Sequence, residues 1–64
     1  MIDPENPFDI GRGVVNISGE RPRFGTITNW TVDWVHVRHQ GENFSRPCAR
    51  EDLEWEDEFR ARYR

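Results

Sequence analysis

The sequence has only one cysteine, Cys48, no lysine and no long apolar run. A single cysteine cannot form a disulfide within the chain, so the disulfide-stabilised scaffolds of small secreted domains are excluded. No stretch approaches the roughly 20 apolar residues that a membrane-spanning helix needs, and no N-terminal apolar run resembles a signal peptide. These absences predict a protein of the reducing cytoplasm that does not span a membrane.

The length of 64 residues allows one compact domain. A chain of this size buries only about 60% of the surface that its unfolded form exposes. A single core of this size rarely supplies more than about 3–5 kcal/mol of stability. Contacts with a partner protein or with a second copy would add to that stability, so homo-oligomerisation is left open.

Charge is distributed in three blocks that together give the net charge of −3. Residues 1–9 carry three acids and no base, and residues 10–50 carry six arginines against three acids. Residues 51–64 carry six acids against three arginines. A mildly basic middle between acidic ends allows either a surface for nucleic acid or charge pairing within the chain.

The residue pattern predicts an irregular arm followed by short strands. Residues 1–10 hold two prolines and three acids, so we expect an acidic arm without regular structure, anchored by Phe8. From Gly11 onward, apolar and polar residues alternate as in half-buried strands. A last short strand near Cys48 is expected at an edge of the sheet, because Pro47 has no N–H to donate.

The last segment changes to the period of a helix. Trp55, Phe59 and Tyr63 recur every fourth residue, acids crowd the start, and glutamates stand four residues before arginines. We expect residues 55–64 to form a helix whose aromatic stripe docks on a β domain of residues 11–54. The predicted fold class is therefore mainly β with a short C-terminal helix.

Several short motifs along the chain point to a more specific fold. They are Gly13-Val14-Val15, Phe24-Gly25-Thr26-Ile27, Trp34-Val35-His36-Val37-Arg38, Gly41 and Arg50-Glu51-Asp52-Leu53-Glu54-Trp55. This frame, over about residues 11–55, resembles the SH3-like barrels of the Tudor and KOW kind, and it is similar to short uncharacterised proteins of actinobacterial phages. The resemblance implies a small barrel of four to five strands in a protein of the host cytoplasm, and it implies no settled activity.

Alternation in the expected strands assigns side chains to two faces. The inward set is Val15, Ile17, Ile27, Val35, Val37, Leu53 and Cys48. The outward set is Trp34, His36 and Arg38, with Trp30 at the adjacent corner and Arg23 and Phe24 at the border. Aromatic residues and arginine are enriched at protein interfaces, so these six residues are the candidate binding site. The alternative is that the C-terminal helix folds over the tryptophans and buries them as core.

Catalytic and metal-binding patterns are weak. His36, His39 and Cys48 offer three ligands where structural zinc takes four, and residues i and i+3 of a strand point to opposite faces. One family of SH3-like barrels, the plasmid-borne dihydrofolate reductases, is enzymatic, but the short Val-Gln-Ile-Tyr signature of its site is missing. We therefore expect no enzyme activity, no cofactor and no metal.

Two functions remain from different classes. The first is a small binding module, a phage accessory protein that engages a host or virion protein through an aromatic and arginine face. The second is single-stranded nucleic-acid binding, in which aromatic residues stack on bases and arginines track phosphates. Those arginines are Arg12, Arg21, Arg23, Arg38 and Arg46. The acidic C-terminal block favours the first function.

Overall fold

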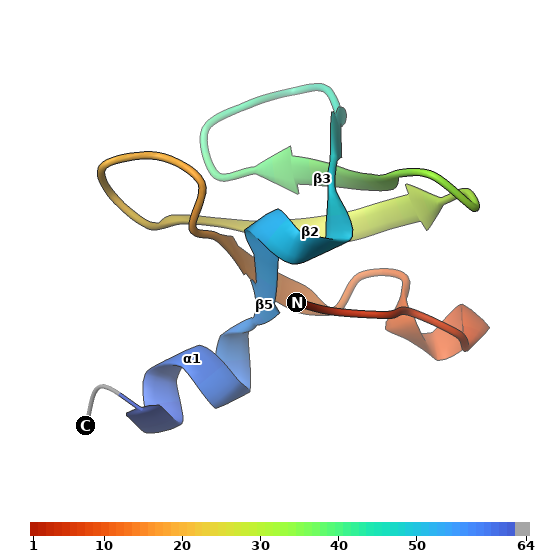
Figure 1. Cartoon of the computed structure of the whole chain (residues 1–64). Coiled ribbons are helices and arrows are strands. Elements are labelled where there is room, and N and C mark those ends of the chain that lie inside the picture. Colours follow the sequence, from red (N-terminus) through yellow and green to blue (C-terminus); the bar gives the residue numbers. More distant parts are fainter. Residues whose placement is uncertain (63–64) are drawn as a thin grey trace.

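The structure, a computed structural model, describes residues 1–62. Within these residues it is mainly β: five antiparallel strands form one sheet in the order β4-β3-β2-β1-β5, and a short helix follows (Figure 1). The predicted fold class, mainly β with a short C-terminal helix, is confirmed. The elements are η1 (Pro7–Asp9), β1 (Gly13–Asn16), β2 (Arg23–Trp30), β3 (Val35–His39), β4 (Arg46–Cys48), η2 (Arg50–Asp52), β5 (Leu53–Trp55) and α1 (Glu56–Arg62).

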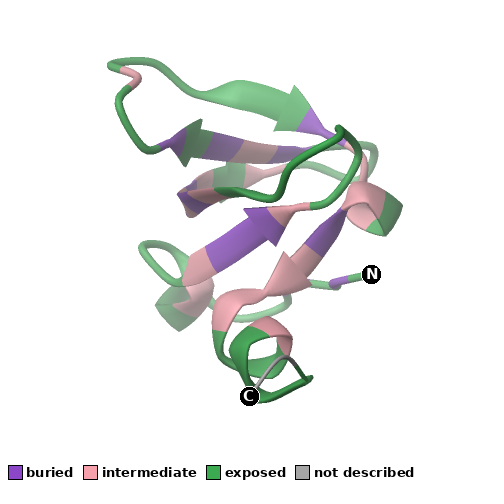
Figure 2. Cartoon of the chain, turned by 90° about the vertical axis from the view of Figure 1, so that its left-hand side faces the viewer, coloured by how far each residue is buried: buried purple, intermediate pink, exposed green. Residues whose placement is uncertain are grey.

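The core is built on one face of the central strands, as the alternation predicts. Ile27 of β2 lies opposite Val37 of β3, and Val35 lies opposite Cys48 of β4. These side chains are buried together with Leu53 of β5, so five of the seven inward assignments are confirmed in one cluster. Figure 2 shows the buried residues concentrated in the strands, with the connecting loops largely exposed.

The inward assignment in β1 was partly wrong. Val14 alternates with the inward residues Val15 and Ile17, which places it on the outward face, but it belongs to the core cluster. Ile17 is 40% exposed just beyond the end of the strand. Val15 is fully buried but lies outside the core cluster, on the face that alternation shares with Gly13. A Cβ at Gly13 would lie 2.6 Å from the Glu56 Oε1 atom, so α1 covers this second face of β1. Both faces of β1 are therefore buried, whereas the alternation predicted one buried face and one solvent-exposed face.

The N-terminal arm is anchored by residues other than the one predicted. Ile2 is 2% exposed and belongs to the core cluster, and its N–H donates to the Arg50 carbonyl oxygen at 3.2 Å. Pro4 is also buried. Phe8, the predicted anchor, is 91% exposed because it sits in η1, a turn that lies away from the core. The prediction that Phe8 anchors the arm is therefore wrong, because Ile2 has that role.

The C-terminal helix starts one residue later than predicted. Trp55 is the last residue of β5, where it packs partly buried against the core, and α1 begins at Glu56. Phe59 meets the Phe24 ring edge-to-face with a centroid distance of 5.9 Å, so part of the predicted aromatic stripe does dock on the sheet. Tyr63, the last member of that stripe, lies outside the described residues.

Candidate functional site

The outer face of β3 carries two of the predicted site residues. His36 is partly buried and Arg38 is exposed, whereas the alternating residues Val35 and Val37 are in the core. The neighbours across the sheet are Thr26 beside Arg38, and Asn29 and Pro47 on either side of His36. The sequence therefore placed these two side chains on the correct face, opposite the core.

Trp34 lies in the turn of residues 31–34, which joins β2 to β3 and is called the Trp34 turn below. The Trp34 N–H donates to Thr31 Oγ1 at 3.1 Å, and the Thr31 N–H donates to the Trp34 carbonyl oxygen at 2.7 Å. The Trp34 side chain is 48% exposed and Val32 is 92% exposed. This turn thus presents apolar side chains to solvent on a hydrogen-bonded backbone.

Arg50 fixes the same turn from a distant part of the chain. Its guanidinium donates to the Val32 carbonyl oxygen at 2.9 Å and to the Thr31 carbonyl oxygen at 2.7 Å. Its Nε atom is also 3.4 Å from Asp3 Oδ1. The planar fork of an arginine matches two adjacent oxygen acceptors, which a lysine does not. Sequence reasoning did not select Arg50, and a contact across 18 residues has no local signal that would have revealed it.

A hollow of about 640 Å³ lies beside the Trp34 turn. It is lined by Met1, Val32, Asp33, Trp34, Ala49, Arg50 and Glu51. Trp30, by contrast, is partly buried and packs against the core cluster. Of the two predicted tryptophans, one is therefore available to a partner and the other mainly stabilises the fold.

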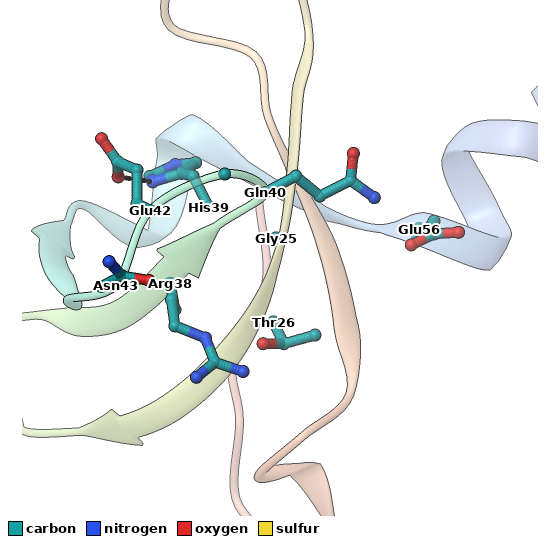
Figure 3. A pocket seen from close by; sticks show the side chains of 9 residues that line it. Gly25, Thr26, Arg38, His39, Gln40, Glu42, Asn43 and Glu56 are labelled. Atoms are coloured by element: carbon teal, nitrogen blue, oxygen red, sulfur yellow. Dashed lines mark ion pairs between the residues drawn. The ribbon is translucent and has the colours of Figure 1, made fainter.

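Arg38 borders a different, polar hollow of about 360 Å³. Figure 3 shows the side chains around it, including Arg38, Thr26 and Gln40 from the sheet and the following turn, and Glu56 from the start of α1. Trp34 is not among its lining residues. The predicted aromatic and arginine face is thus split into an apolar part at the Trp34 turn and a polar part at Arg38.

Arg23 and Phe24 lie elsewhere. Phe24 is partly buried beneath α1, where Phe59 meets its ring and the Arg60 guanidinium lies 4.8 Å from its centroid. Arg23 is 3.4 Å from Glu42 Oε2 in an ion pair. The helix therefore covers Phe24 and leaves Trp34 half exposed, so the alternative in which it buries both tryptophans does not hold for Trp34.

Glu42 is the centre of a charged cluster at the end of β3. Arg46 donates through Nε to both of its carboxylate oxygens, at 3.0 and 3.1 Å, and Arg23 approaches as well. Mainly because of the bond from Arg46, the pKa of Glu42 is below its ordinary value. Two of the arginines from the basic middle of the chain thereby share one carboxylate as their ion-pair partner.

His39 is buried at 2% exposure beside this cluster. Its Nε2 atom lies 3.3 Å from the Asn16 Nδ2 donor, so Nε2 accepts and Nδ1 carries the proton. The Asn16 amide is oriented by Ser18, whose N–H and hydroxyl both donate to Asn16 Oδ1. Burial, followed by the charge of Arg23, lowers the pKa of His39 from its ordinary value of 6.5, although Glu42, whose Oε1 atom is 3.4 Å from Nδ1, acts in the opposite direction. The alternation in β3 indicates an inward position for His39, because His39 is separated from Val35 and Val37 by even numbers of residues.

Three observations concern the reactivity of Cys48, metal ligands and membrane-spanning helices. Burial raises the pKa of the Cys48 thiol, which disfavours the reactive thiolate. Within residues 1–62, no group of three or more His, Cys, Asp or Glu side chains is arranged to hold a metal ion. Over the same residues, no helix is both long enough and apolar enough to cross a membrane.

The chain was compared with protein-family models, with curated proteins and with solved structures, and none of the three comparisons gives a match.

Proposed function

We propose that the protein is a small, non-enzymatic binding module that docks a partner protein through the Trp34 turn. The observation that carries this proposal is the half-exposed Trp34 side chain on a turn whose backbone is held by Arg50. Tryptophan is among the side chains most enriched at interface hot spots. A turn that is already ordered loses less conformational entropy on binding than a mobile one does.

The neighbouring side chains extend this surface. Val32 adds exposed apolar area, and the hollow beside Trp34 offers concave surface with Arg50 and Glu51 at its border. A partner that fits would insert an apolar side chain into the hollow and place polar groups at its rim, which is the usual anatomy of a protein interface. Arg38 and His36 lie on the adjoining sheet face and would contribute to a partner large enough to reach them.

The source of the partner is proposed on the resemblance alone. The motif frame of residues 11–55 resembles SH3-like barrels and short proteins of actinobacterial phages, so we propose a phage accessory protein in the host cytoplasm. Its partner would then be a host or virion protein. The five-stranded antiparallel sheet is compatible with such a barrel.

Single-stranded nucleic-acid binding has less support. Of the five arginines considered for phosphate contacts, Arg12 pairs with Asp9 and Asp57, and Arg23 and Arg46 pair with Glu42. Arg12 also stacks on the Trp55 ring at 3.8 Å. Each of these arginines would have to leave an internal partner before it could neutralise a phosphate.

The test is affinity capture from the host lysate with the wild-type protein and two variants. Trp34→Ala should abolish capture of the partner, because truncating a hot-spot aromatic typically costs about 2 kcal/mol or more. Phe44→Ala is the matched control: Phe44 is 56% exposed and lies outside the hollow at the Trp34 turn, so its loss should leave capture unchanged.

Nuclease treatment of the lysate separates the two functions. Capture that survives nuclease and fails with Trp34→Ala supports the protein partner. Capture that is lost after nuclease, or submicromolar and strongly salt-dependent binding of a labelled single-stranded oligonucleotide, would favour nucleic acid instead.

A further inference from the structure

The η1 turn displays one aromatic ring on a tightly bonded scaffold. Asn6 Oδ1 accepts from the Phe8 N–H at 3.0 Å, and Asp9 Oδ2 accepts from the N–H groups of Glu5 and Asn6 at 3.2 and 3.3 Å. Pro7 fixes the start of the turn. Phe8 is nevertheless 91% exposed. A rigid turn that holds a large apolar ring in water has the form of an interface anchor, because little entropy remains to be lost when the ring is buried.

A receptor for such a ring lies at the other end of the molecule. Among the described residues, Ile17, Gly19, Pro22 and Phe59 line a hollow of about 380 Å³. It is formed where the loop between β1 and β2 meets α1, and Ile17 is 40% exposed there. Its lining is mostly apolar, unlike that of the hollow at Arg38.

Phe8 cannot reach the hollow of its own chain. The segment after η1 is bonded to the middle of β2, where the Gly11 N–H donates to the Ile27 carbonyl oxygen and the Ile27 N–H donates to the Arg12 carbonyl oxygen. Pro22, which lines the hollow, precedes Ile27 by five residues of extended chain, and this corresponds to a separation of roughly 16 Å. Figure 1 shows η1 at one side of the sheet, with the β1–β2 loop and α1 at the opposite side.

The charges around the two features are complementary. Residues 1–9, which contain η1, carry three acids and no base. Of the arginines that border the hollow, Arg23, Arg60 and Arg62 each pair with an acid of the same chain. Arg21, next to Pro22, takes part in none of the ion pairs within residues 1–62. In the arm, Asp3 pairs with Arg50 and Asp9 with Arg12, so Glu5 is the arm acid without an ion pair among the described residues. Glu5 of one molecule is therefore attracted to Arg21 of another.

We propose that this protein associates head to tail with a second copy of itself, with Phe8 of one molecule inserted into the Ile17, Pro22 and Phe59 hollow of the next. The two contact surfaces are different, so the association is heterologous and each pair leaves one free ring and one free hollow for further copies. The contact is separate from the Trp34 turn, which remains available to the partner proposed above.

One phenylalanine ring buries about 150–250 Å², far below a standard interface of about 1,600 Å². We therefore expect a weak association for the single contact, with a Kd on the order of 1 mM.

The decisive experiment mixes two complementary variants and follows them by NMR. Phe8→Ala removes the ring and keeps the hollow, whereas Ile17→Glu blocks the hollow with a charge and keeps the ring. Each variant alone should remain a monomer. When unlabelled Ile17→Glu is added to ¹⁵N-labelled Phe8→Ala, amide shifts should move and saturate at Ile17, Gly19 and Phe59. With the labels exchanged, the shifts should move at Phe8 and Asp9 instead.

Sedimentation of the wild-type protein gives the second measurement. Its mass should rise with concentration, and Phe8→Ala should weaken the association by about tenfold or more. Val32→Ala is the matched control, because Val32 is an equally exposed apolar residue (92%) on a different turn, and it should associate like the wild type. If Ile17→Glu does not fold, Pro22→Glu replaces it as the variant with a blocked hollow.

The proposal is overturned if the wild type stays a monomer well above the expected Kd. It is also overturned if Phe8→Ala associates as well as the wild type, or if the shifts in the mixed sample map to other surfaces. Trp34→Ala should leave the association intact, so failure of this proposal and failure of the proposed function are distinguishable.

Discussion

The clearest test of the fold compares two apolar residues of the N-terminal arm. Ile2 is 2% exposed within the core cluster, whereas Phe8 is 91% exposed, although both belong to a segment that the sequence describes as irregular. Truncation of a buried isoleucine to alanine costs about 2–5 kcal/mol. An arm can relax into the space left behind, so we expect about 2 kcal/mol for Ile2→Ala. Phe8→Ala should stay within about ±0.5 kcal/mol, as surface substitutions do.

The free energy that Ile2→Ala is expected to remove is a large part of the total free energy of unfolding. A core of this size rarely supplies more than about 3–5 kcal/mol, so Ile2→Ala would remove about half of the stability or more. For a domain of this size, 1 kcal/mol corresponds to about 4–8 °C, which gives a fall in Tm of roughly 8–16 °C. Urea unfolding followed by tryptophan fluorescence should show the same loss as a lower midpoint at an unchanged slope.

Phe8→Ala serves as the control in the same assay, at a protein concentration low enough to exclude self-association. Equal stability of the two variants would refute the anchoring role of Ile2. A larger loss from Phe8→Ala would restore Phe8 as the anchor and contradict the structure of the arm.

Two further predictions concern His39 and Gly25. Because burial holds the folded pKa of His39 below 6.5, the unfolded chain binds the proton first as the pH falls. Stability that His39 contributes above pH 6.5 is therefore lost progressively below it, and His39→Gln should remove this part of the dependence in urea titrations at several pH values. At Gly25 an added Cβ would lie 2.7 Å from the Arg38 carbonyl oxygen, so Gly25→Ala should cost about 1–3 kcal/mol. Gly19→Ala, where the nearest atom is 4.0 Å away, should be close to neutral, and equal costs at both glycines would contradict the close approach of β2 and β3.

The sequence predicts which face a side chain lies on where apolar and polar residues alternate along a strand. In β3 the alternation separates Val35 and Val37 from His36 and Arg38, and the structure has the same separation. The rule fails in β1, because Val14 faces the core and α1 covers the opposite face, which carries Gly13 and Val15, so that Val14 and Val15 are both buried. Residue spacing within a strand carries no information about what a distant element will cover.

The candidate site shows the same limit. Sequence reasoning found Trp34 because an exposed tryptophan next to a strand is a local feature. It grouped Phe24 with Trp34, although Phe24 lies under Phe59 of α1. It also overlooked Arg50, whose contacts with the Trp34 turn span 18 and 19 residues. Tertiary contacts decide which members of a predicted surface lie together.

Arg50 also connects the stability of the arm to the geometry of the Trp34 turn. Its carbonyl oxygen accepts from the Ile2 N–H, its Nε atom faces Asp3, and its guanidinium holds two carbonyl oxygens of the turn. The arm therefore helps to orient the side chain that fixes the turn, even though it touches the proposed binding surface only at its first residue. A change that loosens Ile2 from the core should then weaken both folding and partner binding, because the same arginine takes part in both.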